Sequence, residues 1–156
     1  MKHLKIGDPV PSWSGKNENG ERLSSEDFTR KKTAIYFYPK DNTPGCTNQA
    51  CNIRDNYSVL GKEGIHIIGV SADSEKMHQK FIEKQSLPFP LIADEDKSMT
   101  KTFGVWGEKN FMGRTYDGIH RTTFLINEEG KIIDIIEKPK TTAHAQEILE
   151  SFKKNS

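Results

Sequence analysis

Apolar residues occur in short dense blocks along the chain, separated by charged segments. Residues 34–38 form a continuous apolar run that ends at Pro39, which is typical of a central strand covered on both faces. Residues 65–70 predict a second buried strand, and a short strand is expected around 89–92. Apolar runs at 122–126 and 132–136 are joined by the turn sequence NEEG, which predicts a β-hairpin.

A helical period appears directly after the first strand. Apolar positions between 46 and 60 recur at spacings of four, three, four and three, which is one face of an α-helix closing near Gly61. These positions are Cys46, Ala50, Ile53, Tyr57 and Leu60. Residues 71–85 predict a second helix with Met77 and Phe81 facing inward, and residues 97–103 a brief one. Residues 145–152 predict a C-terminal amphipathic helix.

The connecting segments have a different composition. Residues 1–30 are rich in Gly, Pro, Ser and Asn, with NENG as a plausible hairpin turn, and residues 104–120 are expected to form an aromatic loop. The remaining order is strand, helix, strand, helix, strand, then hairpin and helix. This order predicts an α/β fold with a mixed central sheet flanked by helices and an N-terminal extension, in a single domain spanning 1–156.

Composition excludes several classes of function. The net charge is +1, from 23 basic and 22 acidic residues spread along the chain, which argues against a protein that binds nucleic acid or a membrane surface. No stretch resembles a signal peptide or a membrane span, so a soluble cytoplasmic protein is expected. In a reducing compartment, two cysteines are unsuited to a permanent disulfide, and a metal pair, a redox pair or inert thiols are the alternatives.

The segment TPGCTNQAC, residues 43–51, contains both cysteines. Thr43 is a good N-cap, Pro44 suits the first helical position, and Cys46 then falls at the third. Unpaired backbone N–H groups and the helix dipole favour a thiolate in that first turn. Cys46 is therefore the better nucleophile candidate, although a packed core cysteine on the apolar helix face fits the same pattern.

The spacing of Cys51 from Cys46 limits what the pair can do. Five positions along a helix put two Cα atoms about 8.5–9 Å apart, whereas a disulfide needs roughly 4.4–6.8 Å. The two cysteines could bond only if the first turns of the helix unwind. Zinc is disfavoured because none of the five histidines supplies a companion pair of ligands, and the spacing is not that of a C-x-x-C motif.

The stretch PKDNTPGCTNQAC fits the P-x-x-x-T-x-x-C signature of peroxiredoxins, through Pro39, Thr43 and Cys46. With its second cysteine five residues on, it resembles the bacterioferritin comigratory protein (Q-type) branch. The segments GVSADS, FPLIAD, FGVWGEK and GIHRTTFLINEEGKI resemble the same family in the same order. The resemblance implies a thioredoxin-like fold and a thiol peroxidase that reduces hydrogen peroxide and organic hydroperoxides.

The resemblance also implies a role for each residue of the motif. Cys46 would attack the peroxide and become a sulfenic acid, and Cys51 would resolve it as an intramolecular disulfide. Thr43 would orient the peroxide, and the amides of Gly45 and Cys46 would bind the oxygen that gains charge. The other implied site residues are Pro39 and Pro44, which would shield the pocket, and Arg121, which would stabilise the thiolate. Taken alone, Arg121 looks like a surface arginine at a strand edge.

The expected enzyme is a thioredoxin-dependent, atypical two-cysteine peroxiredoxin, soluble and monomeric, with a thioredoxin-type reductant as its partner. No cofactor and no metal are expected, because sulfur carries the electrons. One alternative is a peroxide-responsive redox sensor or binding protein that uses the same cysteines without sustained turnover. Another is a non-catalytic α/β domain with inert thiols, which would be alkylated slowly at neutral pH.

Overall fold

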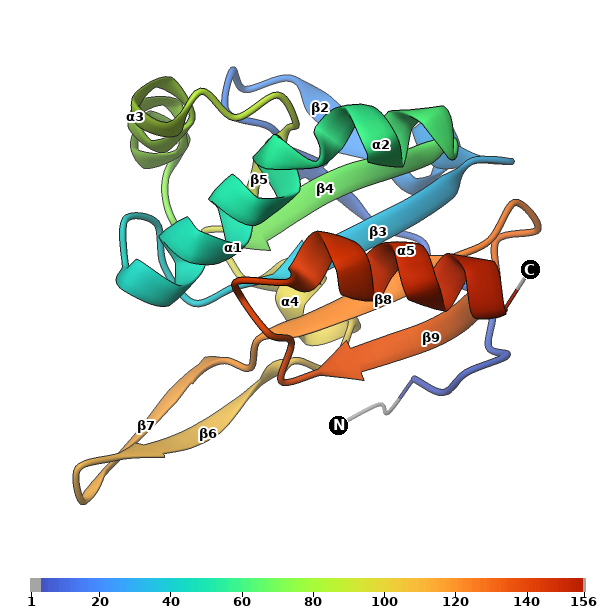
Figure 1. Ribbon diagram of the computed structural model, residues 1–156. Helices are drawn as coiled ribbons and strands as arrows, with labels where there is room; N and C mark the ends of the chain where they lie inside the picture. The colour runs from blue at the N-terminus through green and yellow to red at the C-terminus, as the bar shows by residue number, and fades with distance from the viewer. Residues whose placement is uncertain (1–3, 156) are drawn as a thin grey trace.

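The computed structural model describes residues 4–155. Within that range, a five-stranded mixed sheet runs in the order β5, β4, β3, β8, β9 (Figure 1). The parallel part pairs β3 with β4 and β4 with β5, and the antiparallel part pairs β8 with β3 and β9. The strands are β3 (Lys32–Phe37), β4 (Ile65–Ser71), β5 (Leu91–Ala93), β8 (Thr122–Ile126) and β9 (Ile132–Glu137).

Helices cover both faces of this sheet. The helices α1, α2 and α5 lie side by side on one face, as Figure 1 shows, and α3 adds Phe81 to the same apolar cluster. The helix α4 covers the opposite face together with the N-terminal segment. The helices are α1 (Pro44–Asp55), α2 (Tyr57–Lys62), α3 (Glu75–Gln85), α4 (Ser98–Thr102) and α5 (His144–Lys154). None of the helices between residues 4 and 155 is long and apolar enough to cross a membrane.

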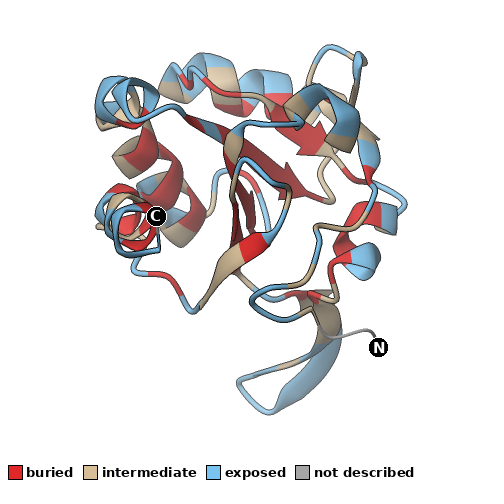
Figure 2. Cartoon of the chain, turned by 90° about the vertical axis from the view of Figure 1, so that its right-hand side faces the viewer, coloured by how far each residue is buried: buried red, intermediate tan, exposed pale blue. Residues whose placement is uncertain are grey.

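The central strand β3 is buried on both sides, as its unbroken apolar run predicts. Alternate side chains enter different clusters, because successive residues of a strand point to opposite faces. Ala34 and Tyr36 pack under α1 and α5, whereas Ile35 and Phe37 pack toward α4. The buried residues shown in Figure 2 accordingly lie along the sheet and on the inner sides of the helices. The predicted α/β architecture with a mixed sheet is confirmed.

The helix predicted from Cys46 to Gly61 is wrong in one respect, because it is interrupted. The helix α1 ends at Asp55, and Asn56 adopts φ −113° and ψ 12° before α2 begins at Tyr57. The Asn56 side chain donates to the backbone carbonyl of Asn52 at 2.8 Å. Asparagine competes for backbone partners in this way, and the apolar period alone does not reveal such an interruption.

The loop predicted for residues 104–120 is also wrong. The strands β6 (Trp106–Phe111) and β7 (Arg114–Ile119) form an antiparallel hairpin that projects from the body (Figure 1). Its two turn residues, Met112 and Gly113, have φ values of +51° and +80°, as a tight hairpin turn requires. Most of its side chains are exposed on both faces, so the sequence has no alternating pattern to predict it.

The N-terminal segment contains the predicted NENG turn, which connects β1 (Ser14–Lys16) to β2 (Arg22–Ser24) in an antiparallel pair. A short 3-10 helix, η1 (Ser25–Phe28), follows β2. The β8–β9 hairpin and the helix at the C-terminus also lie where the apolar pattern predicts them.

Candidate active site

The segment that carries Cys46 begins at the end of the central strand and leads into α1. Thr43 occupies the N-cap position in an extended conformation, Pro44 is the first helical residue, and Cys46 is the third. The Thr43 hydroxyl donates to the carbonyl of Lys40 at 2.8 Å instead of capping the helix. Thr43 therefore fixes the loop before α1, and the predicted side-chain cap is absent from this helix terminus. Cys46 is buried, with 1% of its surface exposed.

Arg121 lies directly against Cys46, although 75 positions separate them in the chain. The sheet explains the contact. Thr122 pairs with Phe37 in the antiparallel β8–β3 register, so Arg121 lies beside the loop that leaves β3. Its Nη2 donates to the Cys46 sulfur at 3.3 Å. The surface position suggested by the sequence alone is therefore wrong for Arg121, which is partly buried.

Gln49 holds Arg121 in this position, and its role was not predicted from the sequence. Its Oε1 accepts a hydrogen bond from Arg121 Nη1 at 2.7 Å, and its side chain is fully buried. Gln49 lies three residues after Cys46, so both side chains occupy the same face of α1. A polar residue beside an otherwise apolar helical stripe is the signal that could have identified it.

Gly45 allows the guanidinium to approach the helix. A Cβ atom added at Gly45 would lie 3.2 Å from Arg121 Nη2, closer than side-chain contacts normally come. Any larger residue at this position would press on the arginine. Of the two prolines, Pro39 is partly buried at the end of the strand, and Pro44 is exposed on the first turn of α1.

Cys51 lies in the same helix but in a different environment. Its side chain is partly buried, and its Sγ–H donates to Gln85 Oε1 at 3.3 Å. Arg54 donates to the backbone carbonyl of Gln85 at 2.7 Å, so the end of α3 is tied to α1 next to Cys51. Both thiols are free, and the unbroken helix between them keeps their Cα atoms about 8.5–9 Å apart.

A cavity of about 530 Å³ opens beside Arg121, on the side of the β6–β7 hairpin. Aromatic and aliphatic side chains from the segment after α4, from β8 and from β9 form much of its wall, and Lys109 contributes an ammonium group. Burial and the neighbouring Arg121 lower the pKa of Lys109, and its Nζ donates to the carbonyl of Ile119 at 3.0 Å. The cavity therefore combines apolar walls with basic groups and one acidic residue, Glu137.

The fold and the site together define a class of protein. A helix that follows the central strand of a mixed sheet presents a buried thiol in its first turn, and an arginine donates to its sulfur. Cationic neighbours of this kind stabilise a thiolate, which is the reactive form of cysteine. This is the arrangement of a thiol-based redox protein with a thioredoxin-like fold.

Comparison with known proteins specifies the class further. Residues 6–135 match the AhpC/TSA family, and the chain belongs to that family. Peroxiredoxin Bcp of Escherichia coli K12 is 45% identical over 156 residues, covering all of both chains. Peroxiredoxin Bcp of Bacillus subtilis is 41% identical over 150 residues, which is 96% of each chain.

Solved structures give the same result. A PrxQ variant from Xylella fastidiosa superposes with a TM-score of 0.91 at 32% identity, covering 99% of this chain and 98% of that one. The bacterioferritin comigratory protein of Xanthomonas campestris, described for its alkyl peroxide reduction activity, gives 0.86 at 33% identity over 94% and 98% of the two chains. The thioredoxin-like fold and the resemblance to Q-type peroxiredoxins are thus confirmed, and the chain is an enzyme of the thiol peroxidase class.

Proposed function

We propose that this enzyme reduces hydrogen peroxide and organic hydroperoxides with Cys46 as the attacking thiolate and Cys51 as the resolving thiol. In the first step, the Cys46 sulfur attacks one peroxide oxygen and the O–O bond breaks. The sulfur becomes a sulfenic acid, and the other oxygen leaves as water or an alcohol after taking up a proton. The sulfur loses two electrons and the peroxide gains them.

The contact between Arg121 and Cys46 is the observation that carries this proposal. A guanidinium within hydrogen-bond distance of the sulfur stabilises negative charge there, both before attack and on the departing oxygen. Gln49 fixes the orientation of that guanidinium and Gly45 leaves room for it. The peroxide would then lie between the sulfur, Thr43 and the first backbone amides of α1.

In the second step, the Cys51 sulfur would attack the sulfenic sulfur of Cys46. An S–S bond forms, the S–OH bond breaks, and hydroxide leaves and takes up a proton to become water. Because the intact helix holds the cysteines beyond disulfide range, the first turns of α1 must unwind beforehand. The Cys51–Gln85 hydrogen bond must also break. A dithiol reductant of the thioredoxin type would restore both thiols by exchange.

Intact-mass spectrometry after one equivalent of peroxide tests the pairing. We expect a loss of two hydrogens, with peptide mapping that assigns a Cys46–Cys51 disulfide. A stable gain of one oxygen with no disulfide would contradict the resolving role of Cys51. Sustained peroxide consumption with a thioredoxin system tests the enzymatic cycle as a whole, and a single stoichiometric oxidation would instead indicate a sensor.

The monomeric state and the cytoplasmic location stay predictions, for which size-exclusion chromatography and cell fractionation are the measurements.

A further inference from the structure

A buried polar cluster lies behind the loop of residues 38–43, which connects β3 to α1 and is called the cysteine loop below. Its centre is His78, whose side chain points inward from α3 and has no exposed surface. The sequence predicted Met77 as the inward residue, but Met77 is partly exposed and His78 takes the buried position. A histidine in a fully buried position requires partners for both ring nitrogens.

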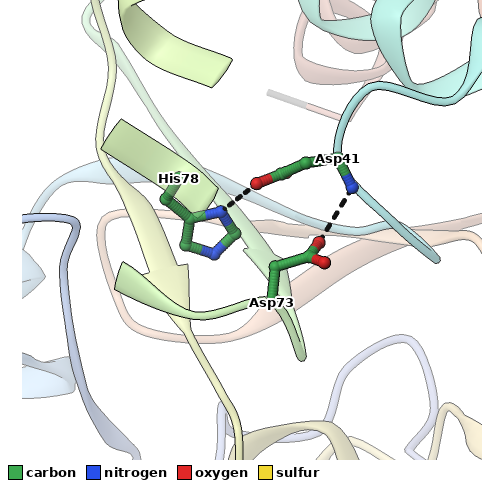
Figure 3. A group of neighbouring side chains, drawn as sticks. All are labelled: Asp41, Asp73 and His78. Carbon is green, nitrogen blue, oxygen red and sulfur yellow. Dashed lines mark hydrogen bonds and ion pairs between the residues drawn. The ribbon is translucent and has the colours of Figure 1, made fainter. Parts of the chain in front are cut away.

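Those partners are both acceptors. His78 Nδ1 lies 2.7 Å from Asp41 Oδ2, and Nε2 lies 2.9 Å from the carbonyl oxygen of Ile92 (Figure 3 shows the Asp41 side). A carbonyl can only accept, so Nε2 carries a hydrogen. The proton shared with Asp41 belongs on Nδ1, because imidazole is a stronger base than a carboxylate. When the ring is an imidazolium, His78 donates to both of these acceptors at once.

The charged groups around His78 agree with that state. Asp41 and the Tyr38 ring face it from the cysteine loop, and Asp73 faces it from the turn after β4. Burial lowers the pKa of His78, but the hydrogen bond and charge of Asp41, the Ile92 carbonyl and Asp73 outweigh it and raise the pKa above its ordinary value. The charged pair is complete below the pKa of a free histidine and is lost as pH rises through the raised pKa.

Asp41 belongs to the cysteine loop and connects that loop to His78. It is 2% exposed, and its second carboxylate oxygen accepts from the Tyr38 hydroxyl at 2.6 Å. Its backbone N–H donates to Asp73 Oδ2 at 2.8 Å, as Figure 3 shows. The next residue, Asn42, has a φ of +62°, so the chain turns sharply there, just before the N-cap residue Thr43 and α1. The position of the first helical turn thus depends on Asp41.

We propose that His78, as an imidazolium paired with Asp41, is a positioning residue that holds the cysteine loop closed, and that loss of its proton eases the opening of α1. This inference rests on the proposed disulfide between Cys46 and Cys51, which requires that opening. A neutral imidazole has only one N–H, so either Asp41 or the Ile92 carbonyl loses its donor. Hydrogen bonds with an ionised partner are about twice as strong as neutral ones, so the closed loop weakens.

The same three side chains could also be considered as metal ligands, because Asp41, Asp73 and His78 offer atoms within 4.8 Å of one another. Hydrogen bonds already occupy these groups. Both nitrogens of His78 and both oxygens of Asp41 are engaged, and Asp73 Oδ2 also accepts from Ser71 at 2.6 Å. A proton between His78 and Asp41 satisfies this geometry without an ion.

The test measures sulfenic acid formation and its conversion to the disulfide separately, by quenched-flow mass spectrometry across a range of pH. We expect the conversion to become about tenfold faster as pH rises past the midpoint at which the His78 ring titrates by NMR. Asp41→Asn keeps the shape of the side chain that pairs with His78 but removes its negative charge. In this variant the conversion of sulfenic acid to disulfide should already be fast at low pH, and its rate should no longer change as His78 titrates. Any pH dependence of thiol attack itself remains in the variant.

His66→Gln is the matched control, because His66 is exposed on β4, away from the cysteine loop, and this variant should keep the wild-type profile. Equal conversion rates in wild type and Asp41→Asn at every pH would overturn the inference. So would one equivalent of zinc retained by wild type and lost in Asp41→Asn. If Asp41→Asn does not fold, disagreement between the His78 midpoint and the midpoint of the wild-type rate overturns it equally well. Failure to form any sulfenic acid would overturn the proposed function instead.

Discussion

The two cysteines belong to one helix, yet their surroundings differ in almost every respect. Cys46 is 1% exposed, and the Arg121 guanidinium donates to its sulfur. Cys51 is partly exposed, and its own S–H donates to the neutral side chain of Gln85. Around Cys46 the groups are arranged to stabilise negative charge on sulfur. The Cys51 thiol itself makes one weak hydrogen bond, to Gln85 on α3, which suits a thiol that would leave its position in the proposed cycle.

Removing the sulfur of Cys46 should have the largest effect on peroxide reduction. Cys46→Ser is expected to abolish peroxide reduction, because Cys51, the other thiol of the proposed site, has no arginine that donates to its sulfur. Peroxide consumption in a thioredoxin-coupled assay measures it. Residual turnover above the uncatalysed rate would show that the two cysteines are less different than their surroundings indicate.

Cys51→Ser should leave the first step intact and stop the cycle. We expect one peroxide reduced per chain, followed by a sulfenic acid that proceeds more readily to the sulfinic form because no thiol condenses with it. Mass spectrometry after one and after several equivalents of peroxide distinguishes the two products. Full thioredoxin-linked turnover in Cys51→Ser would contradict its resolving role.

Arg121→Ala should slow the peroxide step by roughly 100-fold to 1,000-fold, the loss typical of removing one donor to developing charge. The fold should persist, because the arginine lies at the strand end outside the apolar clusters. Stopped-flow kinetics measures the rate and circular dichroism the fold. Arg114→Ala, at an exposed position in the β6–β7 hairpin, is the matched control. Equal rates in both variants would remove Arg121 from the site.

Gln85→Ala should have the smallest effect, and it should accelerate a step of the cycle where the other variants slow or stop one. Without its acceptor on α3, Cys51 is freer to move, and we expect disulfide formation to become about threefold to fivefold faster, as for the loss of one hydrogen bond. Quenched-flow mass spectrometry measures this rate, and Gln79→Ala on the same helix is the control. A slower step would mean that Gln85 helps to present Cys51.

The fold followed from the sequence where burial imposed a pattern on the chain. The run at 34–38 and the apolar period beginning at Cys46 predicted the central strand and the helix that carries both cysteines. The β6–β7 hairpin was missed because neither of its faces is buried, so no alternation of polar and apolar residues marks it.

The candidate site was predictable only in its local part. Spacing placed Cys46 in the first turn of α1, but the contact with Arg121 depends on the β3–β8 register, which residues 75 positions apart cannot reveal. Gln49 and His78 were missed because each is a polar residue at a buried helical position. Their partners come from other segments of the chain, which become neighbours only in the folded protein.

The interruption at Asn56 limits how far local unfolding of α1 would extend along the chain. If the first turns of α1 unwind as the proposed cycle requires, the unwinding would end at Asn56, because α2 begins as a separate helix and its Leu60 is buried in the apolar interior. Each proposed oxidation and reduction would then rearrange a short stretch of backbone while most of the molecule stays folded. Confining the local unfolding to the start of α1 keeps the rest of a protein that is oxidised repeatedly in its folded state.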